Sequence, residues 1–222
     1  MSINFNTHNL IIFQYPIGAG GKFVAACCGL SDKMILNNEI LAEKQINQEL
    51  SKKDKLDYLI KSITGISTWN DFNLGCVQLF GIAIDAYDKI LDPEIEPRIS
   101  PIIAKLQHTD LKFSIVAHTP YKCKLGVNKW PNARIVQFNY NKEFYNKFRP
   151  NQAWMDKQAP LNLPNDTFYW DQRNTLDLQN FLVHLKDLYD WLGFEDFDKD
   201  SITEFYNCYI DVITKLKIVI MK

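Results

Sequence analysis

The sequence predicts an α/β protein with three layers, in which a central, mostly parallel sheet is flanked by helices. Three short runs, residues 9–15, 112–117 and 133–138, are apolar, rich in β-branched and aromatic residues and bounded by turn residues, which is typical of buried strands. About one turn and one helix separate the last two runs, and this spacing favours parallel neighbours. The 222 residues can bury one sizeable core, and no break in composition divides them. We therefore expect one domain over residues 1–222, with a helical segment at about 38–107.

The composition is that of a globular protein without a strong overall charge. Hydrophobic residues make up 46% of the chain and charged residues 23%, which argues against disorder. The formal net charge of −1 creates no field that would attract a polyanion, so nucleic acid is not an expected partner.

The sequence also predicts no membrane association and a cytoplasmic location. The N-terminal residues lack a basic start followed by a long apolar run, and no window reaches the roughly 18 apolar residues that a membrane span needs. The five cysteines are scattered and include no CxxC pair, which favours reduced thiols and no structural zinc.

The first strand leads directly into a glycine-rich loop and a helix. The apolar run at 9–15 stops at Pro16, and from Lys22 small apolar residues predict a short buried helix with Gly29 as its C-cap. Residues 38–62 are charged, with apolar positions at helical spacing, and predict surface helices. Before the second strand we expect three further elements: a helix at 75–90, a proline-rich loop at 92–101 and a short helix at 102–107.

The C-terminal part predicts a long loop followed by two helices. Residues 149–171 contain three prolines and little periodicity, which indicates a loop that either covers a binding site or is an irregular surface segment. Residues 175–193 are strongly amphipathic and predict a helix closed by Gly193. Ser201 and Glu204 have the spacing of a capping box, which would start the last helix.

The loop after the first strand carries the strongest functional pattern. Its glycines, Gly18, Gly20 and Gly21, allow backbone amides to turn toward one point, and the positive end of the following helix is aimed there. A phosphate group fits this geometry, and Lys22 can reach an oxygen of the same ligand. The alternative is that the glycines only form a tight turn. Phe23 occupies the position where the Walker A pattern has Ser or Thr, so the hydroxyl that would hold Mg²⁺ is missing.

His118 is the candidate general base. It follows the apolar strand at 112–117 and precedes Thr-Pro, which places it at the carboxyl end of a parallel sheet, where such folds bind their ligands. An imidazole there can accept a proton from an attacking hydroxyl near neutral pH. The alternative is a histidine whose ring is satisfied by backbone groups at a strand end.

Together these motifs resemble the sulfotransferase family that uses 3′-phosphoadenosine 5′-phosphosulfate (PAPS). The resemblance rests on a strand followed by Tyr-Pro and the glycine-rich loop, on a strand ending in His-x-Pro, on the strand of residues 133–138 and on a C-terminal Trp-Leu-Gly. It implies a P-loop-type fold, with His118 as the base and Lys22 as a second catalytic group. The donor-binding positions it implies are Pro16, Gly18, Ala19, Gly20, Gly21, Lys22, Phe23 and Asn139.

Two family features differ in this sequence. The family's arginine for the 3′-phosphate, just after the third strand, is absent; the neighbouring candidates to replace it are Lys142, Lys147 and Arg149. The family's lysine after Tyr-Pro is Ile17 here.

The resemblance implies transfer of a sulfuryl group from PAPS, without a metal, to a hydroxyl or amine of a small-molecule or glycan acceptor. Two other functions stay open. One is a magnesium-dependent kinase or other nucleotide-using enzyme. Phe23 argues against it, because this residue lacks the hydroxyl that would hold Mg²⁺. The other is a non-catalytic binding or scaffold protein, which the absent arginine would favour.

Overall fold

The computed structural model describes residues 9–15, 20–36, 39–64, 109–117, 120–129, 131–139 and 166–215. The strands in these ranges are β1 (Leu10–Gln14), β2 (Phe113–Ala117), β3 (Arg134–Asn139) and β4 (Thr167–Asp171). The helices are α1 (Gly21–Gly29), α2 (Glu39–Ile46), α3 (Lys52–Ile63), α6 (Pro120–Lys129), the 3₁₀ helix η4 (Gln172–Thr175), α8 (Leu178–Leu192) and α9 (Lys199–Lys215).

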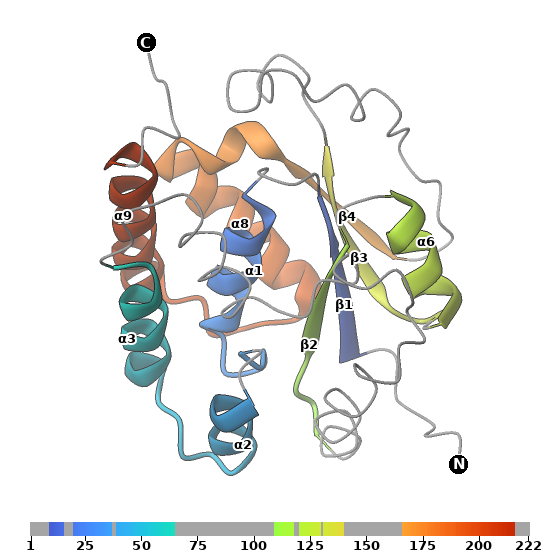
Figure 1. Ribbon diagram of the computed structural model, residues 1–222, viewed down its shortest axis with the longest axis horizontal. Helices are drawn as coiled ribbons and strands as arrows, with labels where there is room; N and C mark the ends of the chain where they lie inside the picture. Colours follow the sequence, from blue (N-terminus) through green and yellow to red (C-terminus); the bar gives the residue numbers. More distant parts are fainter. Residues whose placement is uncertain are drawn as a thin grey trace.

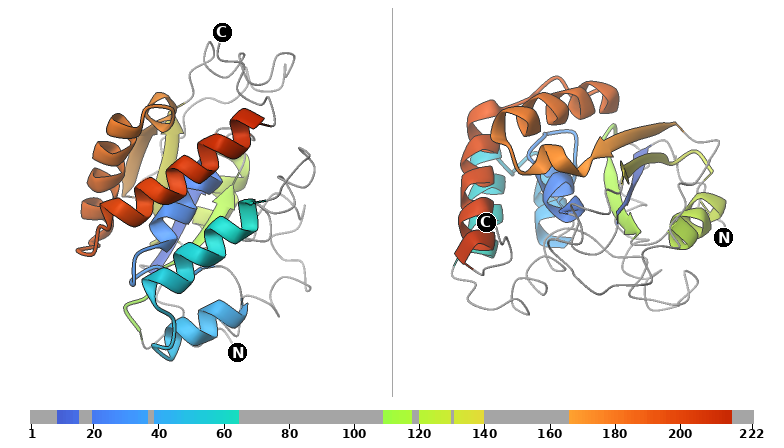
Figure 2. Two further views of the ribbon diagram at one scale, coloured as in Figure 1. Left: turned by 90° about the vertical axis from the view of Figure 1, so that its left-hand side faces the viewer. Right: turned by 90° about the horizontal axis from the view of Figure 1, so that it is seen from above.

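The strands form one parallel sheet with helices on both faces, so the expected α/β class is confirmed. The strand order is β2-β1-β3-β4, and each pair of neighbours is parallel. Figure 1 shows α6 on one face of the sheet and α1 and α8 on the other. Beyond α1 and α8 lie α3 and α9, which run side by side in both views of Figure 2.

The three strands expected from the sequence are confirmed, but their arrangement differs from the expectation. The second and third strands, β2 and β3, are not neighbours, because β1 lies between them and pairs with both. All five residues of β1 are buried, as are all five of β2. Because both strands are buried along their whole length, strand composition alone does not decide which one pairs with which.

The fourth strand, β4, falls inside the segment expected to be a loop. It is an edge strand that pairs only with β3, and Trp170 is its one fully buried side chain. Such a short strand with one protected side carries a weak hydrophobic pattern, which explains the wrong expectation for residues 167–171. Residues 149–165 lie outside the described part of the chain.

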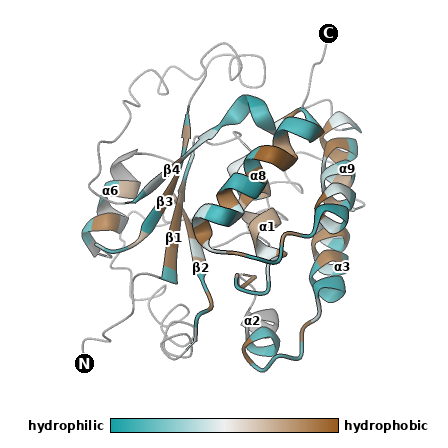
Figure 3. Ribbon diagram, turned by 180° about the vertical axis from the view of Figure 1, so that it is seen from behind, coloured by the Kyte–Doolittle hydropathy of each residue, from teal (hydrophilic) through white to brown (hydrophobic). Residues whose placement is uncertain are grey.

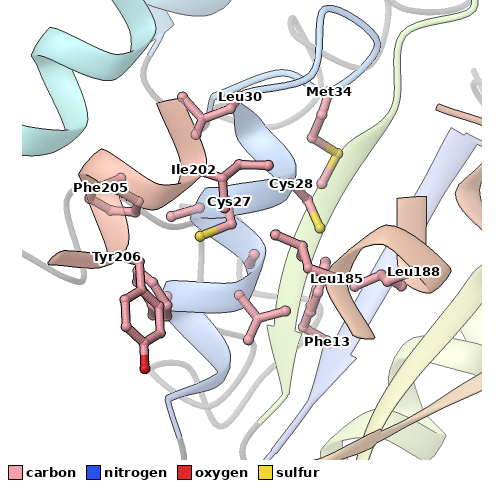
Figure 4. Close-up of a cluster of buried hydrophobic side chains, with 14 of the residues drawn as sticks. Phe13, Cys27, Cys28, Leu30, Met34, Leu185, Leu188, Ile202, Phe205 and Tyr206 are labelled. Carbon is pink, nitrogen blue, oxygen red and sulfur yellow. The ribbon is translucent and has the colours of Figure 1, made fainter. Parts of the chain in front are cut away.

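The main core fills the space between the sheet and α1, α8 and α9. Figure 4 shows Phe13 of β1, Cys27 and Cys28 of α1 and Leu185 of α8 meeting there, with Ile202 of α9 on the far side of α1. Both thiols are free and completely buried, and this burial raises their pKa above the usual range. They therefore serve as small apolar groups that allow α1 to pack closely between the sheet and α9.

The outer helices confirm the amphipathic patterns in the sequence. Figure 3 shows hydrophobic and hydrophilic residues alternating around α3, α8 and α9. In α3, Leu56, Leu59 and Ile63 are buried. The expected elements at 75–90, 92–101 and 102–107 lie outside the described residues. Among the helices that the structure describes, none is both long enough and apolar enough to cross a bilayer.

Two of the expected helix ends need correction. Gly29 is the last residue of α1, and Leu30 is the C-cap. A Cβ on Gly29 would lie 2.6 Å from Cδ2 of Leu36, so glycine is required here by close packing and not by a cap conformation. By contrast, Gly193 has a φ of 76° and ends α8 as expected.

The last helix begins at Lys199 and not at Ser201. The side chain of Asp198 accepts hydrogen bonds from the backbone N–H of Ser201 (3.1 Å) and from its hydroxyl (2.8 Å). The expected capping box with Glu204 is therefore wrong, since Asp198 caps the helix and Ser201 already lies in its first turn.

Candidate functional site

Gly20 and Gly21, the described glycines of the glycine-rich loop, lie at the carboxyl edge of the sheet, where α1 begins (Figure 1). Gly20 is the N-cap residue of α1, with φ 77° and ψ 6°. This left-handed conformation strongly favours glycine, because a Cβ would be strained there. The carbonyl of Gly20 accepts a hydrogen bond from the N–H of Val24 (3.2 Å), so the chain enters the helix directly at Gly20. Residues 16–19, which include Pro16, Gly18 and Ala19, lie outside the described residues.

Gly21 has a packing role. A Cβ at this position would lie 2.0 Å from Cδ1 of Tyr15, whose ring is buried beside the start of the helix. Glycine at this one of the three loop positions is thus required by the close contact between β1 and α1. The same contact holds the end of the strand against the first turn of α1.

The first turn of α1 carries a basic side chain and no acidic one, although an acidic residue is favoured at the positive end of a helix. It contains Lys22, which is half-buried and takes part in a contact with another group. A lysine in this turn is unfavourable for the helix alone, and a bound anion would offset that cost.

Phe23 directs its side chain away from the loop and into the core. Its ring is buried and stacks on that of Tyr209, with 3.9 Å between the centroids, and on that of Phe181 at 5.2 Å. Because the ring is buried, only the backbone amide of Phe23 is available to a ligand at the loop. The residue at the Walker hydroxyl position therefore fills the interface between α1, α8 and α9.

Asn139 is the exposed last residue of β3. It pairs with Asp171 of β4, and it lies two residues beyond Gln137, the partner of Gln14. Asn139 thus extends past the end of β1 on the carboxyl side of the sheet. This is the side on which the first turn of α1 lies.

The structure brings η4 to the loop, which the sequence did not indicate. From a Cβ placed on Gly20, the methyl carbon of Thr175 would be 3.5 Å away and the hydroxyl oxygen of Tyr209 3.7 Å away. Two elements more than 150 residues later in the chain therefore border Gly20. The sequence signal for this edge is the Asp-x-Arg of residues 171–173 after an aromatic run, and it becomes informative only once the strand β4 is known to end at Asp171.

Arg173 of η4 is the basic residue at this edge that the sequence reasoning missed. Its Nε lies 3.0 Å from both carboxylate oxygens of Asp171, and its side chain is 65% exposed. The hydrogen bonds from Arg173 hold the pKa of the Asp171 carboxyl below its usual range, although burial opposes this effect. The pair fixes one side of the guanidinium and leaves the other side accessible to an anion.

Gln172, next to Arg173, carries an unsatisfied acceptor. Its side chain is 2% exposed, and within the described part of the chain no group donates a hydrogen bond to its Oε1. Within the described residues Oε1 of Gln45 is likewise without a donor, so this oxygen does not by itself distinguish η4 from the rest of the core.

His118 lies outside the described residues, as do Lys142, Lys147 and Arg149. Its predecessor Ala117 is described: it is the buried last residue of β2 and pairs with Gln14 of β1. Ala117 thus ends β2 at the same edge of the sheet at which β1 ends with Gln14.

A second polar cluster lies at the opposite, amino edge of the sheet. The ammonium of Lys55 in α3 is fully buried and donates to the carbonyl oxygen of Ser31 at 2.6 Å. Asp196, before α9, accepts from the hydroxyl of Ser31 (2.7 Å) and lies 3.2 Å from the ammonium of Lys52. The cluster joins the end of α1 to α3 and to the α8–α9 connection, so we regard it as structural.

In the ranges that the structure covers, no three His, Cys, Asp or Glu side chains are grouped as they would be to hold a metal ion. Comparisons of the chain with protein-family models, with curated proteins and with solved structures found no match.

Proposed function

We propose that this protein transfers a sulfuryl group from PAPS to a hydroxyl or amine of an acceptor molecule. The observation that carries the proposal is the first turn of α1 at the carboxyl edge of the sheet. Left-handed Gly20 starts it, it holds Lys22, and it lacks any acidic side chain. Ligands of parallel α/β sheets bind at this edge, and a helix N-terminus with a lysine favours an anionic group.

The position of Phe23 favours a donor that does not depend on Mg²⁺. A nucleotide kinase needs a hydroxyl at this position to hold the ion. Here the side chain is a phenyl ring stacked on Tyr209 in the core. Sulfuryl transfer relies on positioning and on fixed positive charge, which the amides of α1 and Lys22 can supply.

In the proposed reaction the acceptor oxygen or nitrogen attacks the sulfur atom of PAPS. The new bond to sulfur forms while the bond from sulfur to the bridging oxygen breaks, and adenosine 3′,5′-bisphosphate leaves with that electron pair. His118 takes the proton of the acceptor. Lys22 and the backbone amides at the start of α1 stabilise the charge that develops on the bridging oxygen.

Among the residues that the structure describes, Arg173 is the best candidate to bind the 3′-phosphate. The family's arginine after the third strand is absent, but the guanidinium of Arg173 lies at the same edge, in the helix whose Thr175 borders Gly20. A guanidinium binds phosphate through paired hydrogen bonds, and Asp171 occupies only part of its donors.

A thermal-shift experiment tests the proposal and its rivals. Adenosine 3′,5′-bisphosphate at about 100 times its Kd should raise Tm by about 5 to 10 °C without Mg²⁺. A shift that requires both ATP and Mg²⁺ would support a kinase instead. If neither ligand shifts Tm, the protein is a non-catalytic member of the fold and the proposal is wrong.

Two variants locate the donor site. Lys22→Ala should weaken bisphosphate binding at least about tenfold, because it removes one charge-assisted contact. The matched control is Lys53→Ala, since Lys53 is exposed and holds the same second position in α3. Arg173→Gln should weaken the 3′,5′-bisphosphate more than adenosine 5′-phosphate. Equal losses for the two ligands would remove the 3′-phosphate role from Arg173.

The base assignment has its own test. His118→Ala should abolish turnover and leave the thermal shift with the bisphosphate unchanged. A variant with full activity would show that another group accepts the proton.

A further inference from the structure

Helix α1 begins without a capping side chain of its own. Its N-cap residue is Gly20, which offers no side-chain oxygen, and the first amides of a helix have no partner within the helix. Two side chains from the C-terminal part of the chain border the place where a capping side chain would start. They are Thr175 and Tyr209, whose nearest atoms lie 3.5 Å and 3.7 Å from a Cβ placed on Gly20. The surroundings of this N-cap therefore come from η4 and α9.

Of these two side chains, only Tyr209 brings a polar atom to Gly20. The hydroxyl of Thr175 is turned away, because its Oγ1 accepts a buried hydrogen bond from Nε1 of Trp170 at 3.2 Å. Thr175 thus presents its methyl group to Gly20, whereas Tyr209 presents its hydroxyl oxygen. A phenol hydroxyl both donates and accepts hydrogen bonds, so it suits the exposed backbone groups at a helix start.

Phe23 fixes the ring of Tyr209. The two rings stack with 3.9 Å between their centroids and 11° between their planes. The rings of Phe181 and Phe205 lie farther from Phe23, at 5.2 Å and 5.3 Å. A tyrosine hydroxyl is rigidly joined to its ring, so a ring that is held by stacking also holds the position of its hydroxyl. Phe23 therefore determines where the hydroxyl of Tyr209 lies.

We propose that Tyr209 is a positioning residue for the donor site at the first turn of α1. Its hydroxyl packs against left-handed Gly20 and fixes the backbone from which the amides of this turn point. Amides that are already in place can stabilise an anion without a cost for reorganisation. Phe23 thus replaces the Walker hydroxyl by a ring that brings a different hydroxyl, from α9, to the start of the helix. The inference rests on the proposed function for the identity of the anion.

Tyr206, one turn earlier in α9, is a matched comparison. It also contacts Phe23, but edge-on with 6.0 Å between the ring centroids, and it is buried. Its hydroxyl lies farther from the Cβ position of Gly20 than that of Tyr209. Tyr206 therefore represents a tyrosine that only packs between the helices, and Tyr209 one that also reaches the N-cap.

The first test needs no ligand and follows the amide of Val24, which donates to the carbonyl oxygen of Gly20 at 3.2 Å and closes the first turn. Tyr209→Phe keeps the stacked ring and removes the hydroxyl. Hydrogen exchange of the Val24 amide, measured by NMR, should become at least about fivefold faster, while the amides of β1 keep their rates. Tyr206→Phe should leave the Val24 rate unchanged. An unchanged rate in Tyr209→Phe, or an equal acceleration in β1, overturns the inference.

The second test is the affinity for adenosine 3′,5′-bisphosphate, measured by calorimetry. Tyr209→Phe should weaken binding about five- to tenfold, because the turn is no longer held in place. Tyr209→Leu, which also loses the stacking on Phe23, should weaken it further, and Tyr206→Phe should leave it unchanged. Equal affinities of the native protein and Tyr209→Phe overturn the positioning role, even where the Val24 exchange has changed.

Together the two measurements separate this inference from the proposed function. A native protein that binds no bisphosphate, with Val24 exchange still sensitive to Tyr209→Phe, refutes the PAPS donor and leaves Tyr209 as the residue that positions the turn. A native protein that binds the bisphosphate as tightly as Tyr209→Phe does, with unchanged Val24 exchange, leaves the proposed function standing and refutes the role of Tyr209.

Discussion

The buried ammonium of Lys55 allows the polar cluster at the amino edge of the sheet to be tested quantitatively. The side chain is fully buried in α3, with its Nζ 2.6 Å from the carbonyl oxygen of Ser31 and 3.7 Å from Oδ1 of Asp32. Burial lowers the pKa of Lys55 from 10.5 to about 8, although Asp32 and Asp196 partly oppose this and Lys52 adds to it. The unfolded chain therefore binds the proton more tightly than the folded protein.

The sign of the pH dependence follows from this difference. Below about pH 8 both states carry the proton, and the folded state bears the full cost of the buried charge. Between about pH 8 and 10.5 the folded state loses the proton first, so the contribution of Lys55 to the free energy of unfolding rises with pH. At about 1.4 kcal/mol for each pH unit, the whole interval corresponds to about 3 kcal/mol.

The perturbation is Lys55→Met, which removes the ionisable group and keeps a side chain of similar length. The assay is urea unfolding of the native protein and the variant at several pH values. The free energy of unfolding of the native protein, minus that of the variant, should rise by about 2 kcal/mol between about pH 7.5 and about pH 9.5. The buried thiols and tyrosines titrate in both proteins, so their contributions cancel.

A difference that stays flat or falls over this range would refute the reasoning, because the ammonium would then be no more desolvated than in the unfolded chain. The same measurement on Lys53→Met controls for the loss of one lysine charge, since Lys53 lies exposed in the same helix.

Two further pairs of variants test the local geometry by chemical unfolding. Gly21→Ala should lower the free energy of unfolding by about 1 to 3 kcal/mol, because its Cβ would meet the ring of Tyr15 at 2.0 Å. Gly193→Ala should cost about 1 to 2 kcal/mol from its φ of +76° alone, since nothing lies within 4 Å of its Cβ position; an equal loss after relief by Tyr15→Leu would contradict the packing role of Gly21. Asp198→Ala should cost about 1 kcal/mol as the loss of a helix cap, and Glu204→Ala less than about 0.5 kcal/mol; the reverse order would restore the capping box.

Local patterns in the sequence predicted most of the secondary structure. The apolar runs gave β1, β2 and β3 within one residue at either end, and the amphipathic period gave α8 with its left-handed Gly193. These features depend on neighbouring residues, since a strand or helix shows its period within a few turns of chain. The glycine-rich loop could be placed between a strand and a helix for the same reason.

Two of the misassigned features depend on tertiary contacts. Gly29 is explained by Leu36, and the edge strand β4 exists because β3 offers it a partner. The cap of α9 was missed for a smaller reason, because the helix starts two residues earlier than the more familiar Ser-x-x-Glu pattern suggests.

For the candidate site, the sequence by itself determined the chemical groups: three glycines, a lysine in a first helical turn and a phenylalanine in place of a hydroxyl. Only the tertiary structure decided which residues surround them. It brought Thr175 and Tyr209 to Gly20. The physical reason is that the register of parallel strands and the docking of helices are set by packing over the whole core, which no local window of sequence contains.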